Sequence, residues 1–290
     1  MSKKFKEVSE VPIKIGKIGN LNMNNVVGSY DILFLCLDTL RYDVAIEAEK
    51  ENTTPILNKY GNWEKCIAPG NFTYPSHHAM FSGFLPSPFD AKNISDREFL
   101  FFPKKIGLGN VAPKNSFAFE GSNFIEGLYK VGYKTICIGG VGFFDKRSDI
   151  GRVFPNMFEE SYWHNNFSCS NPDSTKNQIE FAIKKLENLE KDKKVFLYIN
   201  ISAIHYPNYY YVDERKNKVC EKDDILSHRK ALEYVDKNLG ILFKYFKEKR
   251  EKTFVITTSD HGTCYGEDGF QFHGINHSCV NTIPYKHFFL

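Results

Sequence analysis

The sequence predicts an α/β protein, a three-layer α/β/α sandwich in which helices cover both faces of a largely parallel central sheet. Four short apolar runs have the composition of strands buried on both faces: residues 31–38, 133–139, 194–202 and 252–260. Segments with helical spacing lie between them, and this alternation is typical of parallel sheets with right-handed crossovers. A hydrophobic fraction of 42% in 290 residues supplies enough apolar side chains for such a core.

The chain is expected to consist of an N-terminal extension, residues 1–28, and one domain, residues 29–290. The extension is polar and weakly patterned, apart from a short strand that we expect near Val11–Ile15. Besides the helix described below for residues 77–82, four helices are expected in the domain. The first has a cap near Asn52 and a proline in its first turn, and the others are amphipathic; they cover residues 52–60, 124–131, 174–189 and 223–249.

Charge and composition argue against several classes of protein. The 38 Lys and Arg and 35 Asp and Glu are interspersed and leave a net charge of +3, so a nucleic-acid partner is not expected. A membrane partner is not expected either, since the longest apolar run, Ile32–Leu37, is far shorter than the roughly 20 residues of a membrane-spanning helix. The chain begins without the apolar core of a secretory signal, and its seven cysteines are scattered, which argues against a disulfide framework or a zinc ribbon. We expect a cytoplasmic protein, with an exported one as the alternative and oligomerisation left open.

Acidic and imidazole side chains follow three of the predicted strands. Asp38 comes directly after the first strand, Asp260 and His261 after the last, and His205 just after a third, while His273 lies in the loop beyond Asp260. The carboxyl ends of parallel strands meet at one edge of the sheet, where ligands bind. These donors suit a divalent cation, Zn²⁺ or Mn²⁺, or Mg²⁺ or Ca²⁺ with more oxygen ligands. Taken singly, each acid could instead cap a turn and His205 could be a core residue.

The segment 68–86, APGNFTYPSHHAMFSGFLP, adds a candidate nucleophile. Thr73 precedes Pro75, and Ser76 is expected to cap or begin a helix over His77–Ser82. A hydroxyl beside a helix N-terminus lies where phosphate or sulfate binds well. Threonine is a weak nucleophile unless a bound cation lowers the pKa of its hydroxyl, so the alternative for Thr73 alone is a turn cap.

Several of these motifs together resemble the alkaline phosphatase superfamily on its sulfatase-like side. ILFLCLDTLRYD resembles the first-strand metal motif, the stretch through FTYPSHHAMFSGFLP resembles the one that carries the nucleophile, and TTSDHGTCYGEDGFQFHG resembles the late metal motif. The similarity runs from about residue 31 to the end. With CIGGVGFFDK, LYINISAIHYPNYY and the terminal TIPYKHFFL, the chain looks most like a compact bacterial group of sulfatase-like metallohydrolases.

The resemblance implies a role for each matching position. Asp38, Thr73, Asp260 and His261 match the metal ligands, with Thr73 also the nucleophile. His205 resembles the histidine near the leaving group. His273 resembles either a ligand of a second metal or a partner of the anion, and we expect His205 or His273 to protonate the departing oxygen. A divalent ion of unspecified identity is the implied cofactor.

Two departures from the family pattern limit the implied activity. The sulfatase motif Cys/Ser-x-Pro-Ser-Arg is replaced by Thr73-Tyr74-Pro75-Ser76-His77, so formylglycine cannot form and the usual arginine is absent. Position 201 is Ile, which breaks the second-metal pair with His205 and favours one tight metal. We therefore expect a metal-dependent hydrolase of small-molecule phosphate or sulfate esters, with His77 offsetting charge on the equatorial oxygens. A phosphoryl or phosphoalcohol transferase and a non-catalytic metal-binding partner protein remain the alternatives.

Overall fold

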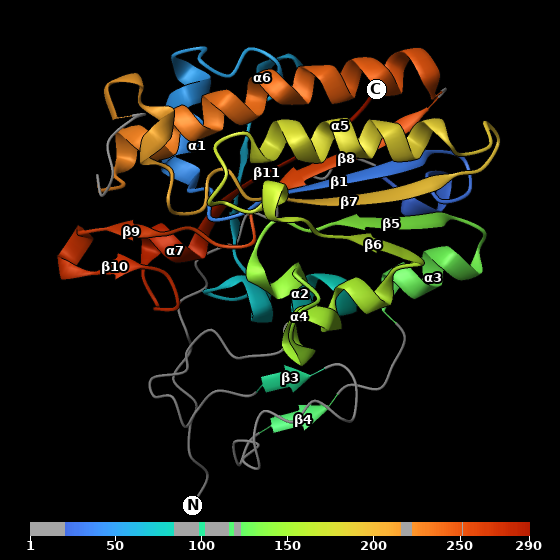
Figure 1. Ribbon diagram of the computed structural model, residues 1–290, viewed down its shortest axis with the longest axis horizontal. Helices are drawn as coiled ribbons and strands as arrows, with labels where there is room; N and C mark the ends of the chain where they lie inside the picture. Colours follow the sequence, from blue (N-terminus) through green and yellow to red (C-terminus); the bar gives the residue numbers. More distant parts are fainter. Residues whose placement is uncertain (1–20, 84–98, 102–115, 119–122, 216–221, 251) are drawn as a thin grey trace, which may run out of the picture.

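A mixed, seven-stranded sheet forms the centre of the computed structural model, which describes residues 21–83, 99–101, 116–118, 123–215, 222–250 and 252–290 (Figure 1). The strand order is β2-β11-β8-β1-β7-β5-β6. The five neighbours from β8 to β6 are parallel, and β11 runs antiparallel to both β8 and β2. The strands of this sheet are β1 (Asp31–Leu37), β2 (Glu64–Ile67), β5 (Lys134–Ile138), β6 (Glu160–Tyr162), β7 (Val195–Ile201), β8 (Thr253–Thr258) and β11 (Thr282–Phe289).

Helices cover both faces of this sheet, so the predicted three-layer sandwich is confirmed. One face carries α1 (Tyr42–Lys50), α5 (Ser174–Glu187) and α6 (Ile225–Lys249), and the other carries α2 (Thr73–Ser82), α3 (Phe124–Lys130) and α4 (Asp149–Val153) (Figure 1). Short elements complete the described part: β3 (Phe99–Phe101), β4 (Ser116–Ala118), β9 (Cys264–Tyr265), β10 (Gln271–Phe272), α7 (Ser278–Asn281) and 3₁₀ turns at Met23–Asn25, Leu57–Tyr60, Gly142–Phe144, Pro155–Met157, Asn165–Phe167, Tyr209–Tyr211, Asp213–Arg215 and Glu267–Gly269.

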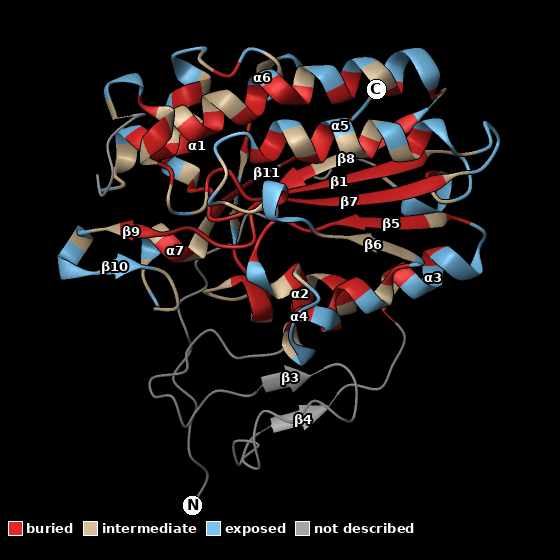
Figure 2. Ribbon diagram, viewed as in Figure 1, coloured by how far each residue is buried: buried red, intermediate tan, exposed pale blue. Residues whose placement is uncertain are grey.

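Strand β1 lies between two apolar layers, which explains its continuous apolar sequence. Its alternate side chains Leu33, Leu35 and Leu37 pack with α1, α5 and α6. Ile32, Phe34 and Cys36 pack on the other face, with α2, α3 and α4. All seven residues of β1 and all seven of β7 are buried (Figure 2). A strand covered on both faces needs apolar residues at every position rather than at every second one.

The structure confirms the four predicted strands to within one or two residues at each end and corrects several boundaries. Helix α1 and strand β11 were not predicted. The segment expected to be helical over 52–60 contains only the 3₁₀ turn Leu57–Tyr60. Helix α2 begins at Thr73, earlier than expected, because Pro75 falls in its first turn, where no backbone N–H is needed. The strand expected near Val11–Ile15 lies outside the described residues.

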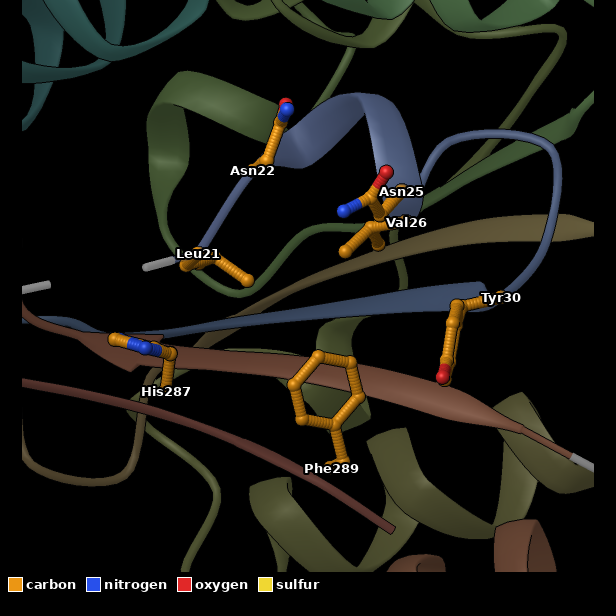
Figure 3. A pocket seen from close by; sticks show the side chains of 7 residues that line it. All are labelled: Leu21, Asn22, Asn25, Val26, Tyr30, His287 and Phe289. Carbon is orange, nitrogen blue, oxygen red and sulfur yellow. The ribbon is translucent and has the colours of Figure 1, made fainter. Parts of the chain in front are cut away.

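The described end of the predicted extension packs on the domain. Val26 is buried in the apolar layer of α2, α3 and α4, and the Tyr133 hydroxyl accepts a hydrogen bond from the Gly28 amide at 2.8 Å. Figure 3 shows a pocket between this segment and β11. Tyr30 precedes β1 and Phe289 ends the antiparallel β11, so the pocket lies toward the amino ends of the parallel strands. It is lined by Leu21, Asn22, Asn25, Val26, Tyr30, His287 and Phe289.

A buried ion pair joins the start of β1 to the end of α6. Arg250 donates to Asp31 at 2.7 Å and 3.1 Å, and both side chains are almost fully buried. The Arg250→Met variant leaves the Asp31 carboxylate without its partner, which we expect to lower the free energy of unfolding by about 3–5 kcal/mol. Urea denaturation would measure it, with the exposed pair member Lys244→Ala as a control that changes stability by less than about 0.5 kcal/mol. A loss from Arg250→Met no larger than that of the control would contradict this account.

Candidate metal centre and nucleophile

Two buried carboxylates meet where β1 and β8 end. The strands pair in parallel with Cys36 opposite Thr258, so Asp38 and Asp260 follow their strands at the same edge of the sheet. Both side chains are fully buried. One oxygen of each carboxylate, Asp38 Oδ1 and Asp260 Oδ2, has no hydrogen-bond partner. Buried polar atoms are normally paired, so these two oxygens mark a place where another group is expected to bind.

His261 and Thr73 complete the group of four predicted ligands. His261 Nδ1 donates to the Gly262 carbonyl at 2.8 Å, because a carbonyl can only accept, and this leaves the lone pair on Nε2. That Nε2 lies 3.4 Å from Asp260 Oδ2, 4.0 Å from Asp38 Oδ1 and 3.3 Å from Thr73 Oγ1. The sequence-based prediction that these four residues lie together agrees with the geometry.

Without a cation, this arrangement carries an electrostatic cost. Burial and, to a smaller extent, the neighbouring carboxylate of Asp260 together raise the pKa of Asp38 to about 8. Burial likewise raises the pKa of Asp260 to about 7, although backbone N–H groups, including that of Thr39, oppose the rise. Burial lowers the pKa of His261, which favours the neutral, ligating form of its ring. The protein thus places two acids together where charge is least tolerated.

A divalent cation fits these residues. Ligand atoms of Asp38, Asp260 and His261 lie within 4.8 Å of one another, and two carboxylates with one neutral imidazole are a common set for zinc or manganese. The two oxygens that lack partners belong to this same set. The residues would hold the ion with the Thr73 hydroxyl as a neighbour.

Two residues to which the sequence reasoning gave no role orient the carboxylates. Asn200, at the end of β7, donates to Asp38 Oδ2 at 2.9 Å and accepts from the amides of Gly140 and Val141. Thr39 donates its backbone N–H to Asp260 Oδ1 at 3.3 Å and has a φ of 66°. A β-branched residue in this left-handed region is strained by about 1–3 kcal/mol. The backbone is thus held in a costly conformation at the point where its amide meets the metal-site acid.

Thr73 is the first residue of helix α2, so its hydroxyl lies at the positive end of the helix dipole. The extended conformation of Phe72 allows the chain to turn into the helix at this residue. Ser76, one turn later, donates to the backbone carbonyl of Asp260 at 2.8 Å. This bond fastens the helix end to the loop that carries Asp260 and His261.

His77 does not have the position expected for a residue that binds the equatorial oxygens. It is fully buried, its Nδ1 donates to the Thr73 carbonyl at 2.7 Å, and its Nε2 is hydrogen-bonded to the Tyr198 hydroxyl. Burial lowers its pKa to about 3. Both nitrogens are therefore engaged in a neutral ring below Thr73, so His77 supports the helix end rather than offering a charge.

His205 and His273 lie beside His261. The ring centre of His273 is 4.5 Å from that of His261 and 5.5 Å from that of His205. His205 Nδ1 donates to the Tyr206 carbonyl at 2.7 Å, which leaves its Nε2 with a lone pair. Burial lowers the pKa of His205 to about 4 and that of His273 to about 3. Both predicted proton-transfer candidates thus lie close to the predicted metal ligand His261, as neutral imidazoles.

The fold and this donor set define a class of protein: an α/β metalloenzyme of the alkaline phosphatase superfamily that acts on phosphate or sulfate esters. The chain belongs to the sulfatase family, whose profile matches residues 31–285. This span includes all seven predicted site residues, from Asp38 to His273. No curated protein sequence matches the chain.

Solved structures share the fold at low sequence identity. The C-terminal periplasmic domain of phosphoethanolamine transferase EptC from Campylobacter jejuni has 20% identity and a TM-score of 0.60, over 90% of this chain and 79% of that one. The zinc complex of the C-terminal periplasmic domain of EcEptC from Escherichia coli has 14% identity and a TM-score of 0.58, over 89% and 73%. BT4656 in complex with its substrate D-glucosamine-2-N,6-O-disulfate has 13% identity and a TM-score of 0.56, over 89% and 70%.

The expected cytoplasmic location is wrong on this comparison. The similar structures include periplasmic domains from two organisms, whereas the prediction rested on the scattered cysteines and on the polar start of the chain. Within the described residues, no helix has the length and apolar character needed to span a membrane.

The Asp38→Asn variant tests the electrostatic account of the centre. The asparagine oxygen still accepts from Asn200, but one of two adjacent buried charges is gone, so the metal-free variant should be more stable than the metal-free wild type by about 1–3 kcal/mol in mildly alkaline buffer. The same variant should lose most of the thermal stabilisation that added Mn²⁺ gives the wild type.

Thermal unfolding with and without a chelator measures both effects. Asp236→Asn provides the control, because Asp236 is also buried but accepts from the amides of Ile56 and Leu57, away from the centre. Unchanged metal stabilisation in Asp38→Asn would exclude Asp38 as a ligand.

Proposed function

We propose that this protein is a divalent-metal-dependent hydrolase of phosphate esters in which Thr73 is the nucleophile. One observation supports this most directly. The Thr73 hydroxyl lies on the first residue of a helix, 3.3 Å from His261 Nε2, in the same cluster as the two carboxylate oxygens that lack partners. A small anionic ester is the proposed substrate. Phosphate is favoured over sulfate because a threonine at position 73 cannot become formylglycine.

Three side chains would activate the nucleophile Thr73, and a fourth, His77, would position it. Asp38, Asp260 and His261 would hold a divalent ion, which supplies positive charge that lowers the pKa of a nearby hydroxyl and neutralises oxygens of the ester. The Thr73 hydroxyl would lose its proton to solvent, and Oγ1 would attack phosphorus in line with the leaving oxygen, whose bond to phosphorus breaks as the phosphothreonine forms. The backbone N–H groups of Thr73 and Tyr74, at the start of α2, would stabilise the oxygens of the transferred group. His77 fixes the Thr73 carbonyl through Nδ1 and so acts as a positioning residue.

His205 and His273 are proposed to handle protons on the leaving-group side. His205 Nε2 has a free lone pair, and an anionic ester placed beside it would raise its affinity for a proton. The imidazole can then protonate the departing oxygen and later take a proton from the water that cleaves the phosphothreonine. His273 Nδ1 is buried without a partner and is the second candidate for this contact.

Transfer to an alcohol is a second candidate, favoured by two exposed aromatic rings beside the histidines. Tyr206 and Phe272 are 43% and 52% exposed, and their ring centres lie 5.0 Å apart. Phe272 precedes His273 and has a φ of 63°, a strained conformation for a bulky residue. Strain of this kind collects at functional sites. The pair offers an apolar surface on which an organic leaving group or acceptor can lie.

Replacing the nucleophile tests the proposed hydrolase. Thr73→Ala should lower turnover of an aryl phosphate mono- or diester by at least about 10³-fold, because no other hydroxyl replaces Oγ1. Metal content should stay within error of the wild type, since Asp38, Asp260 and His261 remain. Thr73→Ser, which keeps the hydroxyl, should retain measurable turnover and should form a phosphoserine detectable by mass spectrometry after acid quench. Retained turnover in metal-loaded Thr73→Ala would rule out the assignment.

The aromatic pair separates transfer from hydrolysis. With an aryl phosphodiester and a soluble alcohol acceptor, Phe272→Ala and Tyr206→Ala should each reduce the ratio of transferred to hydrolysed product by about tenfold, because one ring of the stacking surface is lost. Phe270→Ala is the matched control, since Phe270 is 45% exposed but its ring faces His277 instead of Tyr206. If no variant or wild-type sample yields a transferred product, hydrolysis alone describes the activity.

A further inference from the structure

A second group of potential metal ligands lies outside the centre described above. Cys264, His277 and Cys279 bring two thiols and one imidazole together, with ligand atoms within 4.8 Å of one another. They come from β9, from the residue before α7, and from α7 itself. We call these three residues the thiol cluster. None of them takes part in the proposed reaction at Thr73.

The geometry of the thiol cluster resembles that of a zinc site. His277 Nδ1 lies 3.3 Å from Cys264 Sγ, close to the separation of about 3.5 Å that tetrahedral bonds of about 2.3 Å to sulfur and 2.0 Å to nitrogen would give. The same Nδ1 accepts the Cys279 N–H at 3.1 Å and so caps α7, and a bound ion would take the place of this hydrogen bond. His277 Nε2 lies 3.2 Å from Asp268 Oδ2. A carboxylate that holds the far nitrogen of a ligating histidine is the usual outer contact of zinc sites, because it fixes the tautomer and the ring orientation.

The surrounding charges tolerate a cation with two thiolates. Zn²⁺ bound by two ionised thiols carries no net charge, so the neighbouring ion pairs of Arg41 with Asp43 and Glu267 need not change. Cys264 is fully buried, whereas Cys279 is partly exposed and the His277 side chain is 11% exposed. The cluster is therefore sheltered yet open to an entering ion and to a fourth ligand from solvent.

A hydrogen bond and close packing join the thiol cluster to the loop that carries Asp260 and His261. The Gly262 amide donates to the Val280 carbonyl at 2.7 Å. A Cβ on Gly262 would lie only 1.9 Å from the Cys279 carbonyl oxygen, so α7 presses directly on the residue after His261. Strand β10 pairs with β9, with Phe272 opposite Cys264. A metal ion bound by both Cys264 and Cys279 would thus join the two ends of segment 264–279 and hold Phe272 and His273 in place.

We propose that Cys264, His277 and Cys279 bind a thiophilic divalent cation of the zinc class. This ion cross-links the two ends of the segment 264–279 beside the proposed catalytic metal centre. Each thiol loses its proton on binding, and no oxidation occurs. Closing this segment reduces its conformational freedom. The thiol cluster is thus proposed as a second, structural metal site with its own ligands, and this proposal does not depend on whether Thr73 reacts.

Zinc content and X-ray absorption test this proposal directly. In protein prepared under reducing conditions with Zn²⁺, the Asp38→Asn/Asp260→Asn double variant should retain about one zinc ion per chain, with a sulfur shell at about 2.3 Å. Adding Cys264→Ser and Cys279→Ser should remove that ion and the sulfur shell. His277→Asn keeps an oxygen that can cap α7 in place of Nδ1 but removes the imidazole ligand, so zinc affinity should fall by about 10-fold or more.

Cys66→Ser is the matched control, because Cys66 is a partly buried free thiol on β2. It should keep both the zinc ion and the sulfur shell. Circular dichroism of each variant separates loss of metal from loss of fold, and His277→Asn serves as the test if the serine variants do not fold. Zinc without a sulfur shell, or no zinc with both thiols reactive, would overturn the proposal. So would a mass lower by about 2 Da that shows a Cys264–Cys279 disulfide in the reduced preparation.

Discussion

Two carboxylates buried side by side are the constraint on which the rest of this structure depends. Asp38 and Asp260 are fully buried, and each has one oxygen without a partner. A folded protein tolerates such a pair only where other interactions compensate, because both desolvation and like charge act against it. The side chain of Asn200 and the backbone N–H groups of Thr39 and His261 hold the carboxylates in this unfavourable place. A divalent cation bound between the carboxylates would remove their repulsion, and this relief would contribute to the free energy of metal binding.

The central sheet makes this placement possible. Strands β1, β7 and β8 are parallel neighbours, so the residues that follow them meet at one edge without any long connection within the site. The helix that begins at Thr73 reaches the same edge from the face that carries α2, α3 and α4, and Ser76 fastens it to the Asp260 carbonyl. Rigid elements on both sides therefore limit how far the hydroxyl can move from the ligands, and this kind of preorganisation lowers a reaction barrier.

The sequence revealed the parts of this arrangement that depend on local pattern. The apolar runs before Asp38 and Asp260 identified β1 and β8, and the rule that ligands bind at the carboxyl ends of strands brought their acids together. Strand β11 was missed because its alternation is interrupted by Pro284 and Lys286 and it pairs antiparallel. The strain at Thr39 and the inward turn of His77 were also missed, since both depend on partners far along the chain, Asp260 and Tyr198. The thiol cluster escaped notice for the same reason: its residues have no motif spacing and meet only because β9, β10 and α7 fold back on one another.

The inward position of His77 affects which anion the centre can hold. Where the family motif has an arginine, this chain has an imidazole whose nitrogens bond to Thr73 and Tyr198, so this position supplies no positive charge to a substrate. A divalent ion held by Asp38 and Asp260 would be neutralised by them, and the helix end contributes only about half an elementary charge. When one positive charge is missing from the site, a singly charged diester loses less binding free energy than a doubly charged monoester. The reason is that each uncompensated charge in a buried site costs free energy. The exposed rings of Tyr206 and Phe272 offer contact to the second organic group that a diester carries. For the proposed hydrolase, charge and shape would therefore both favour a diester over a monoester.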